Sequence, residues 1–386
     1  MRAFLYQFDF ALRSLLRRKV KNFSILLLFS LIVFLFSAVD FLMGSLYQQA
    51  MTALQFQPEI IIQNLKAGRQ LPVPLAWAEK IRTITGVRKV VPRVWGYYFD
   101  RYTGANYTIV GLDREMMKGL GVPRELLPLR EREVLVGEGI MEGRQLQVGK
   151  RLQLERPDEV PVDFTVKGTF RSRVSLWTYD VVAMTEEAAR YLFDLADDEA
   201  WDLAVYVPNP VEVAKVGEKI LRRIPGARLI AKDQLIRTYG TSYGFRSGLM
   251  IAVSISCLLA FFILAYDRAA GLSREEQMEI AVLKALGWET RDVIRTTMLQ
   301  SLILSLTGFL IGLIAAYIHV FILGAPALRI AFTGWSALYP THPLPPVVDL
   351  TKVMSLMFLT VIPYVAVGIV PVWRSAIIDP EVVFRG

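Results

Sequence analysis

Residues Phe23–Leu46 read FSILLLFSLIVFLFSAVDFLMGSL, an apolar run whose only charged residue is Asp40. The run exceeds the roughly 20 residues that a helix needs to cross about 30 Å of hydrocarbon. It also exceeds the roughly 7–15-residue apolar region of a signal peptide, so it predicts an uncleaved membrane span. Basic residues precede it: Arg13, Arg17, Arg18, Lys19 and Lys21.

Three later runs have the length and composition of membrane spans. They are Leu249–Ala265, Leu299–Leu323 and Val353–Val372, the last of which contains Pro363 and Pro371. Prolines are tolerated in membrane helices because neighbouring groups satisfy the freed carbonyls. The sequence therefore predicts four membrane-spanning helices.

The charge of the short loops gives these spans a direction. The loop from residue 267 to 297 is basic, whereas the loop from 324 to 352 has only Arg329 before its final Lys352. The basic residues of the first loop are Arg268, Arg274, Lys284, Arg291 and Arg295. Because positive loops stay in the cytoplasm, both termini are expected there and residues 47–246 outside.

A helical apolar pattern also precedes the first span. Phe4, Phe8, Ala11, Leu12 and Leu15 recur at helical spacing, opposite polar residues. This pattern predicts an amphipathic helix on the inner membrane face. A simple inward extension of the first span is the alternative.

Composition separates a membrane part from an aqueous part. Hydrophobic residues make up 53% of the 386 residues, above the roughly 45–50% of soluble proteins, and the excess lies in the four runs. The net charge of +8 comes from basic residues beside those runs, so it favours membrane orientation over nucleic-acid binding. The single cysteine, Cys257, excludes an intrachain disulfide, and two histidines give little basis for a metal site.

The aqueous segment contains an internal repeat. A strand at 58–63, a helix ending near Ile81 and a strand at 87–91 are repeated as a strand at 201–207, a helix at 211–224 and a strand at 227–230. We expect the two β-α-β units to pack as one α+β layer.

Between these units, residues 99–200 are rich in short strands and turns. Strands are expected at 107–111, 133–137, 151–154, 164–168 and 181–184. No nucleophile, metal-ligand or acid-base spacing occurs there, so no catalytic residue is assigned. Asp197, Asp198 and Glu199 are interpreted as a solvated loop.

The expected fold class is a membrane α-helical protein with four transmembrane helices plus an extracytoplasmic α+β domain that carries an inserted β-rich subdomain. The expected segments are a cytoplasmic amphipathic helix (1–21), the first span (22–46), the outside domain (47–246, with its insertion at about 99–200), the second span (247–267), a cytoplasmic coupling segment (268–297), the third span (298–324), an outside loop (325–350), the fourth span (351–373) and a cytoplasmic tail (374–386).

Two segments carry a family resemblance. Residues 273–288 read SREEQMEIAVLKALGW, and residues 371–385 read PVWRSAIIDPEVVFR. Both resemble segments of the MacB/FtsX/LolC-type ABC transporter permeases, whose tail usually has one more residue than Asp379-Pro380-Glu381 provides. The order of one span, a soluble domain and three spans is similar to that family as well.

The resemblance implies a dimeric permease in the bacterial inner membrane, either a homodimer or a heterodimer, above a cytoplasmic ABC ATPase dimer. ATP and magnesium would be bound by that ATPase and no cofactor by this chain. Substrates would be lipids, lipoproteins, peptides or drugs; the alternative is a signal transmitter that activates a cell-wall hydrolase. A periplasmic adaptor or outer-membrane partner stays open.

The same resemblance assigns ATPase coupling to the short helix that ends at Gly287. Its candidate residues are Arg274, Glu275, Glu279, Ala281, Leu283, Lys284 and Gly287. Met278, Ala281, Val282 and Ala285 form one apolar stripe that could lie in an ATPase groove. A helix packed only on the bilayer is the alternative.

The phosphate-binding pattern of ATPases does not occur in the sequence. Gly149-Lys150 is followed by Arg151 and has no glycine at the required distance upstream. The nucleotide site is therefore expected on another chain.

Four polar or small residues within the spans could have either a functional or a structural role. Asp40 lies roughly 26 Å along its span, near an interface where charge costs little, so a structural role is favoured. His319 is interpreted as a packed helix residue. Gly308 and Gly312 form a G-x-x-x-G spacing that would let two helices approach closely, within the chain or in a dimer.

Overall fold

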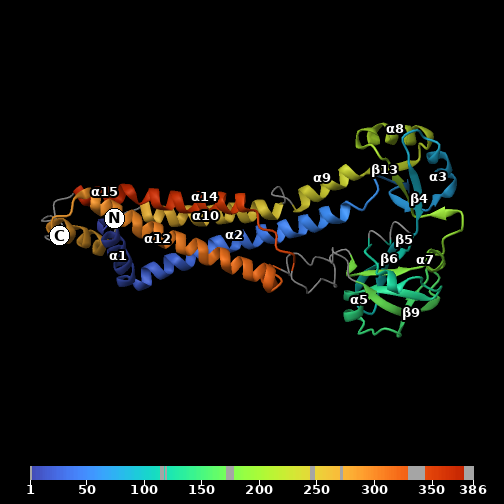
Figure 1. The fold of residues 1–386 in the computed structure, drawn as a ribbon, viewed down its shortest axis with the longest axis horizontal. Coiled ribbons are helices and arrows are strands. Elements are labelled where there is room, and N and C mark those ends of the chain that lie inside the picture. The colour runs from blue at the N-terminus through green and yellow to red at the C-terminus, as the bar shows by residue number, and fades with distance from the viewer. Residues whose placement is uncertain are drawn as a thin grey trace. The chain divides into compact units, whose positions relative to one another are not determined.

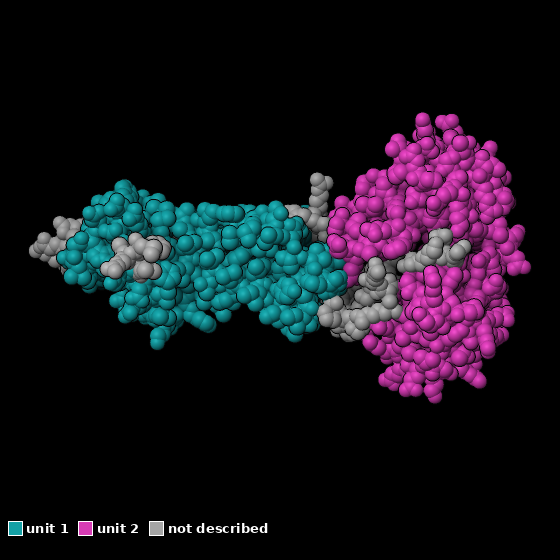
Figure 2. Space-filling view, in the orientation of Figure 1, with its two compact units in different colours: residues 1–45, 244–328, 343–386 teal, residues 46–243, 329–342 magenta. Residues whose placement is uncertain are grey.

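The computed structural model describes residues 2–113, 117, 120–170, 178–243, 248–269, 273–328 and 344–377. It has two compact units, coloured in Figure 2: a helical unit of residues 1–45, 244–328 and 343–386, and a sheet unit of residues 46–243 and 329–342. Asp379-Pro380-Glu381 of the predicted tail, and Arg329 and His342 of the predicted outside loop, lie outside the described residues.

The helical unit is a bundle in which α2, α10, α12 and α14 run side by side (Figure 1). Its elements are α1 (Arg2–Arg17), α2 (Lys19–Leu54), α10 (Gly248–Ala269), α11 (Arg274–Ala285), α12 (Thr290–Tyr317), the π-helical turn η3 (Ile318–Ile322), α14 (Leu350–Val367) and α15 (Ile369–Ile377). Within the described ranges, four helical segments are long and apolar enough to cross a membrane: Lys19–Leu54, Met250–Asp267, Thr290–Ile322 and Leu350–Ile377. The predicted four-span architecture is confirmed.

Small residues bring α12 close to α2. A Cβ added at Gly312 would lie 2.5 Å from the carbonyl oxygen of Ser30, and one added at Gly308 would lie 3.2 Å from the Phe29 ring. Glycine is therefore required at Gly312 for this separation of the two helices. The face that carries both glycines packs against a helix of the same chain.

Three side chains within the spans, Asp40, His319 and Cys257, are buried among neighbouring residues. The Asp40 carboxylate of α2 lies 2.8 Å from the Lys352 ammonium in the first turn of α14, so the ion pair links two spans. His319 is buried with its ring centroid 5.4 Å from that of Phe34. Cys257 is buried as well. Asp40 thus has a structural partner that its position in the sequence did not identify.

The sheet unit contains one sheet built from the two repeated β-α-β units. Its strands are β1 (Ile60–Lys66), β2 (Arg69–Leu71), β4 (Lys89–Arg93), β12 (Asp202–Tyr206) and β13 (Ala227–Ala231), in the order β13-β1-β12-β4 with β2 paired to β1. All pairings are antiparallel. The helices α3 (Leu75–Arg82) and α8 (Val213–Arg223) pack on it through Ile81 and Ile220, against Ile60 and Ile62. The two β-α-β units thus form one α+β layer, as expected from the internal repeat, and the order of the strands shows that each unit is split by a strand of the other.

The insertion forms a second sheet. Its strands are β5 (Trp95–Asp100), β6 (Ala105–Gly111), β7 (Glu133–Gly137), β8 (Arg151–Glu155), β9 (Pro161–Phe170) and β10 (Val181–Met184), in the order β5-β6-β10-β7-β9-β8. The remaining elements of the whole sheet unit, inside and outside the insertion, are β3 (Val73–Pro74), η1 (Arg124–Leu126), α5 (Glu138–Gly143), α7 (Glu186–Phe193), β11 (Glu199–Ala200), η2 (Pro210–Glu212) and α9 (Lys232–Tyr243). The sheet begins at Trp95, before the predicted boundary at Phe99, because the aromatic run from Trp95 onward pairs with β6.

A buried carboxylate anchors the start of this second sheet. Asp100 is 1% exposed and accepts hydrogen bonds from the Tyr107 hydroxyl at 2.7 Å, from the Thr103 amide at 3.0 Å and from Arg144. Burial by itself would raise the pKa of Asp100, but the hydrogen bonds from Arg144, Thr103 and Tyr107 lower it to about 2. Burial raises the pKa of Tyr107 to about 12, so the phenol remains a donor.

The Asp100 network predicts a pH-dependent contribution to stability. Because the folded-state pKa lies below the ordinary value of 3.8, the stabilisation is present above about pH 4 and is lost as the pH falls towards 2. We expect Asp100→Asn to lower the free energy of unfolding at pH 7 by about 2 kcal/mol. Thermal unfolding of the full protein in detergent at pH 7 and pH 3 measures this.

Asp163→Asn is the matched control, because the Asp163 side chain on β9 is 44% exposed. It should change the melting temperature little at either pH. An equal loss in both variants, or a loss in Asp100→Asn that does not shrink at acid pH, would contradict the assignment.

Candidate functional site

The short helix α11 between the second and third spans has well-defined ends. Ser273 and Glu276 form a capping box, in which the Glu276 carboxylate accepts from the Ser273 amide at 2.9 Å. At the other end Gly287 has φ +92°, and the Trp288 amide donates to the Leu283 carbonyl at 3.1 Å. The Gly287 amide donates to the Lys284 carbonyl, which completes a Schellman motif. The helix is thereby fixed in length at both ends.

One face of α11 is packed into the helical unit. Ile280 is 6% exposed and lies in an apolar cluster with Val293 of α12 and with Val372 and Ala376 of α15. At the end of α11, the ring of Trp288 lies 5.2 Å from that of Phe10 on α1. The helix is therefore attached to three other helices through apolar contacts.

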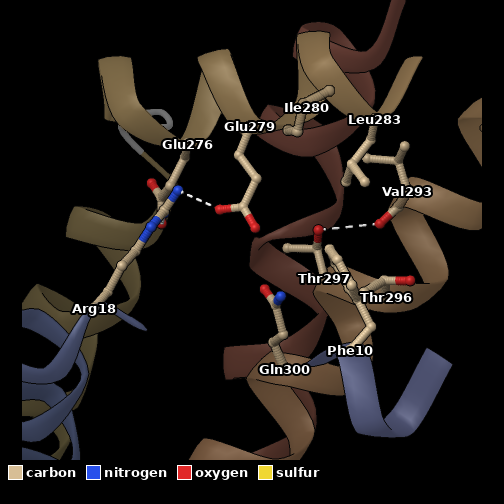
Figure 3. Close-up of a pocket in the computed structure, with 10 residues that line it drawn as sticks. All are labelled: Phe10, Arg18, Glu276, Glu279, Ile280, Leu283, Val293, Thr296, Thr297 and Gln300. Atoms are coloured by element: carbon tan, nitrogen blue, oxygen red, sulfur yellow. Dashed lines mark hydrogen bonds and ion pairs between the residues drawn. The ribbon is translucent and has the colours of Figure 1, made fainter. Parts of the chain in front are cut away.

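A charged network ties α11 to the junction between α1 and α2. Arg18, where the chain turns between these helices, is 3.0 Å from Glu276 and 2.6 Å from Glu279 (Figure 3). Lys21 of α2 lies 3.1 Å from Glu276, and Arg17 of α1 pairs with Glu279. Two acidic residues, one helical turn apart, thus hold basic residues from two other helices.

Burial strengthens this network relative to an ordinary surface ion pair. The Arg18 side chain is 19% exposed, that of Glu276 14% and that of Glu279 21%. Exposed ion pairs contribute roughly 0–1 kcal/mol, whereas loss of one partner from a buried pair costs roughly 3–5 kcal/mol. The Ser14 hydroxyl adds a hydrogen bond of 3.0 Å to Glu279. We expect an intermediate cost for breaking this pair.

The space between these helices is small. A cavity of about 40 Å³ lies beside the Arg18–Glu279 pair, with the side chains drawn in Figure 3. Its lining residues are Phe10, Arg18, Glu276, Glu279, Ile280, Leu283, Val293, Thr296, Thr297 and Gln300. That volume suits water and is far below the roughly 300 Å³ of the smallest typical ligand pockets. The space beside this ion pair is therefore too small for a drug-sized ligand.

The opposite face of α11 carries apolar side chains that lie open. Met278 is 40% exposed, Val282 46% and Leu286 74%, at successive helical turns. The predicted single stripe is therefore divided, since Ala281 is 3% exposed and packs inward while Met278 and Val282 point outward. The sequence could not separate these faces because both are apolar.

The predicted coupling residues fall into two groups. Glu279, Ala281 and Leu283 are on or near the packed side, whereas Arg274, Glu275 and Gly287 are exposed. The Lys284 ammonium lies 3.2 Å from the Thr290 hydroxyl at the start of α12. The prediction missed Arg18 and Glu276, because the basic flank was interpreted only as a signal for membrane orientation.

The ion-pair network predicts that removing one charge loosens α11. We expect Glu279→Gln to raise amide hydrogen exchange in residues 274–285 about tenfold, since a loss of about 1.4 kcal/mol in local stability changes the open population tenfold. Hydrogen-exchange mass spectrometry of the protein in detergent measures this.

Glu275→Gln is the control, because Glu275 lies on the same helix and is exposed. It should leave the exchange of α11 within error. Unchanged exchange in Glu279→Gln would show that the ion pairs do not hold the helix.

Comparisons with known proteins cover both units. Residues 245–380 match the model of the FtsX-like permease C-terminal domain, and residues 22–223 match that of the MacB-like periplasmic core domain. The comparison with curated proteins returned no match.

Two solved structures are similar over the soluble part. The periplasmic region of MacB from Actinobacillus actinomycetemcomitans is 11% identical, with a TM-score of 0.33, over 46% of this chain and 91% of that one. The extracellular domain of the noncanonic ABC-type transporter YknZ from Gram-positive bacteria is 12% identical, with a TM-score of 0.30, over 44% of this chain and 98% of that one.

Proposed function

Because the chain belongs to the MacB/FtsX-type ABC transporter permeases, we propose that it couples ATP hydrolysis on a separate ATPase to the movement of a lipophilic or amphipathic substrate. The substrate would be a lipid, lipoprotein, peptide or drug that is extracted or exported by mechanotransmission. Motion begun at α11 would pass through the spans to the sheet unit.

The observation that carries this proposal is the two-sided construction of α11. Its inner face is fixed to α1, α2, α12 and α15 by Arg18 and by the Ile280 cluster. Its outer face presents Met278, Val282 and Leu286 without a covering helix among the described residues. A helix that is rigidly attached on one side and apolar on the other is suited to lie in a partner's groove and to transmit displacement.

The charge pattern supports a cytoplasmic position for this helix. Arg274 and Lys284 lie on α11, and Arg291 and Arg295 begin α12, on the same side of the membrane as Arg17 and Arg18 by the order of the spans. Positive loops favour the cytoplasm, so both termini would lie there and the sheet unit outside, in a bacterial inner membrane.

The partners follow from the proposed role. An ABC ATPase dimer would bind ATP and magnesium, and a second permease chain would place two α11 helices above its two subunits. Whether the second chain is identical, and whether an adaptor joins the sheet unit, are parts of the proposal that purification of the native complex can address.

Charges placed on the outer face of α11 should uncouple the complex. We expect Met278→Asp and Leu286→Asp each to reduce binding of the ATPase at least tenfold, because the groove would have to desolvate a carboxylate. Co-purification with the ATPase and permease-stimulated ATP hydrolysis measure the effect.

Val211→Asp is the matched control, since Val211 is 86% exposed and belongs to the sheet unit and not to α11. Its ATPase binding should equal that of the wild type. Undiminished binding in both α11 variants would refute the proposed contact.

The proposed orientation predicts which cysteines react from outside the cell. In a Cys257→Ser background, we expect Val211→Cys in intact cells to react with a membrane-impermeant maleimide, and Glu275→Cys to react only after the membrane is opened. Both positions are exposed, so reactivity reports location. Labelling of Glu275→Cys in intact cells would reverse the orientation.

A further inference from the structure

The sheet unit contains a cavity of about 510 Å³, within the roughly 300–1,000 Å³ range of small-molecule sites. Its walls come from both sheets, from the segment before β1 and from α9. The first sheet contributes Ile61 and Arg93 to the lining, and the second sheet contributes Thr108 and Val110. Helix α9 contributes Leu235. This cavity is more than ten times larger than the space beside α11.

Most of the lining is apolar or aromatic. Trp95, Val110 and Val181 come from the insertion, while Ile230 and Leu235 come from the β13–α9 region. Such surfaces gain roughly 25 cal/mol for each Å² of apolar ligand area that they remove from water. The lining therefore favours a ligand with an apolar body.

Among the described residues, the charged side chains that line the cavity are one arginine and three aspartates. They are Arg93, Asp113, Asp180 and Asp202. Asp202 forms a bidentate ion pair with Arg93, with hydrogen bonds of 2.6 and 2.7 Å. It also accepts a hydrogen bond of 2.8 Å from the Trp95 indole. Burial would lower the pKa of Arg93, but Asp202 raises it above its ordinary value, so the guanidinium stays protonated.

Asp180 lies just before β10 and differs from Asp202 in its surroundings. It is partly buried, and no basic side chain among the described residues forms an ion pair with it. Burial raises the pKa of Asp180 to about 6, so the carboxylate is mainly ionised at pH 7, and no basic side chain in the described ranges neutralises it. A cation in the cavity would neutralise it.

We propose that this cavity binds a cationic amphiphile of drug size, with its apolar body against Trp95 and Leu235 and its cation beside Asp180. Its use as a transport substrate site rests on the proposed function, whereas equilibrium binding needs neither ATP nor the ATPase. An anionic compound of the same size would face the Asp180 carboxylate and should bind more weakly.

The test uses the full chain in phosphatidylcholine nanodiscs, without ATP or ATPase. The probe is berberine, a fluorescent aromatic cation, with anilinonaphthalene sulfonate as an anionic aromatic comparison; signal from protein-free nanodiscs is subtracted. We expect saturable berberine binding that weakens about tenfold in Asp180→Asn, because an ionic hydrogen-bond partner is lost. Asp158→Asn, at a half-exposed side chain in the β8–β9 turn, is the matched control and should bind as the wild type.

The pH response and a filled cavity provide two further readouts. Wild-type affinity should fall as the pH drops through about 6, because protonated Asp180 is neutral, and Asp180→Asn should lose this dependence. Because Asp180→Asn changes this side chain alone, the comparison separates its effect on affinity from that of the other charged or titratable groups of the lining. These groups are Arg93, Tyr97, Asp113, Asp202, Tyr206 and Tyr239. Thr108→Trp should abolish binding by occupying the cavity.

The proposal is overturned if Asp180→Asn binds berberine as tightly as the wild type, or if the sulfonate binds as tightly as berberine. It is also overturned if Thr108→Trp, with an unchanged melting temperature, retains full affinity. Loss of ATPase coupling in Met278→Asp with berberine binding intact would separate a coupling defect from a failure of this site.

Discussion

The ion pairs of Arg18 with Glu276 and Glu279 join three segments that are far apart in the sequence. Arg18 stands where α1 gives way to the first span, and the two glutamates stand on the helix between the second and third spans. Because these groups are mostly shielded from water, their attraction is less weakened than that of surface pairs. The ion pairs therefore link α11 directly to the junction of α1 and α2, and the Ile280 cluster links it to α12 and α15.

A buried ion pair also joins distant segments in the sheet unit. Asp202 is fully buried on β12, faces Arg93 of β4 in the strand register and receives the indole of Trp95 from the insertion. One carboxylate thus links the repeated β-α-β layer to the first strand of the inserted sheet. The large cavity lies against this junction, so its shape depends on both sheets being held together.

The exposed and buried apolar residues of α11 show how packing assigns roles that composition cannot. Ile280 and Val282 are similar in chemistry and two residues apart, yet Ile280 is 6% exposed and Val282 46%. Ile280 packs in the bundle, whereas Val282 lies on the exposed face that the proposed ATPase contact would use. Gly312 shows the reverse case, in which the absence of a side chain lets α2 and α12 meet.

The four spans, the repeated β-α-β units and most strands of the insertion could be predicted from the sequence, because hydrophobic length and periodicity act locally along the chain. The sequence also identified the α11 segment through its family resemblance. The folded structure was needed to show which glutamates pair with Arg18, that Asp40 pairs with Lys352 and that Asp180 lines a cavity. These contacts join residues hundreds of positions apart or on separate sheets, and nothing in a local pattern encodes which distant side chains become neighbours.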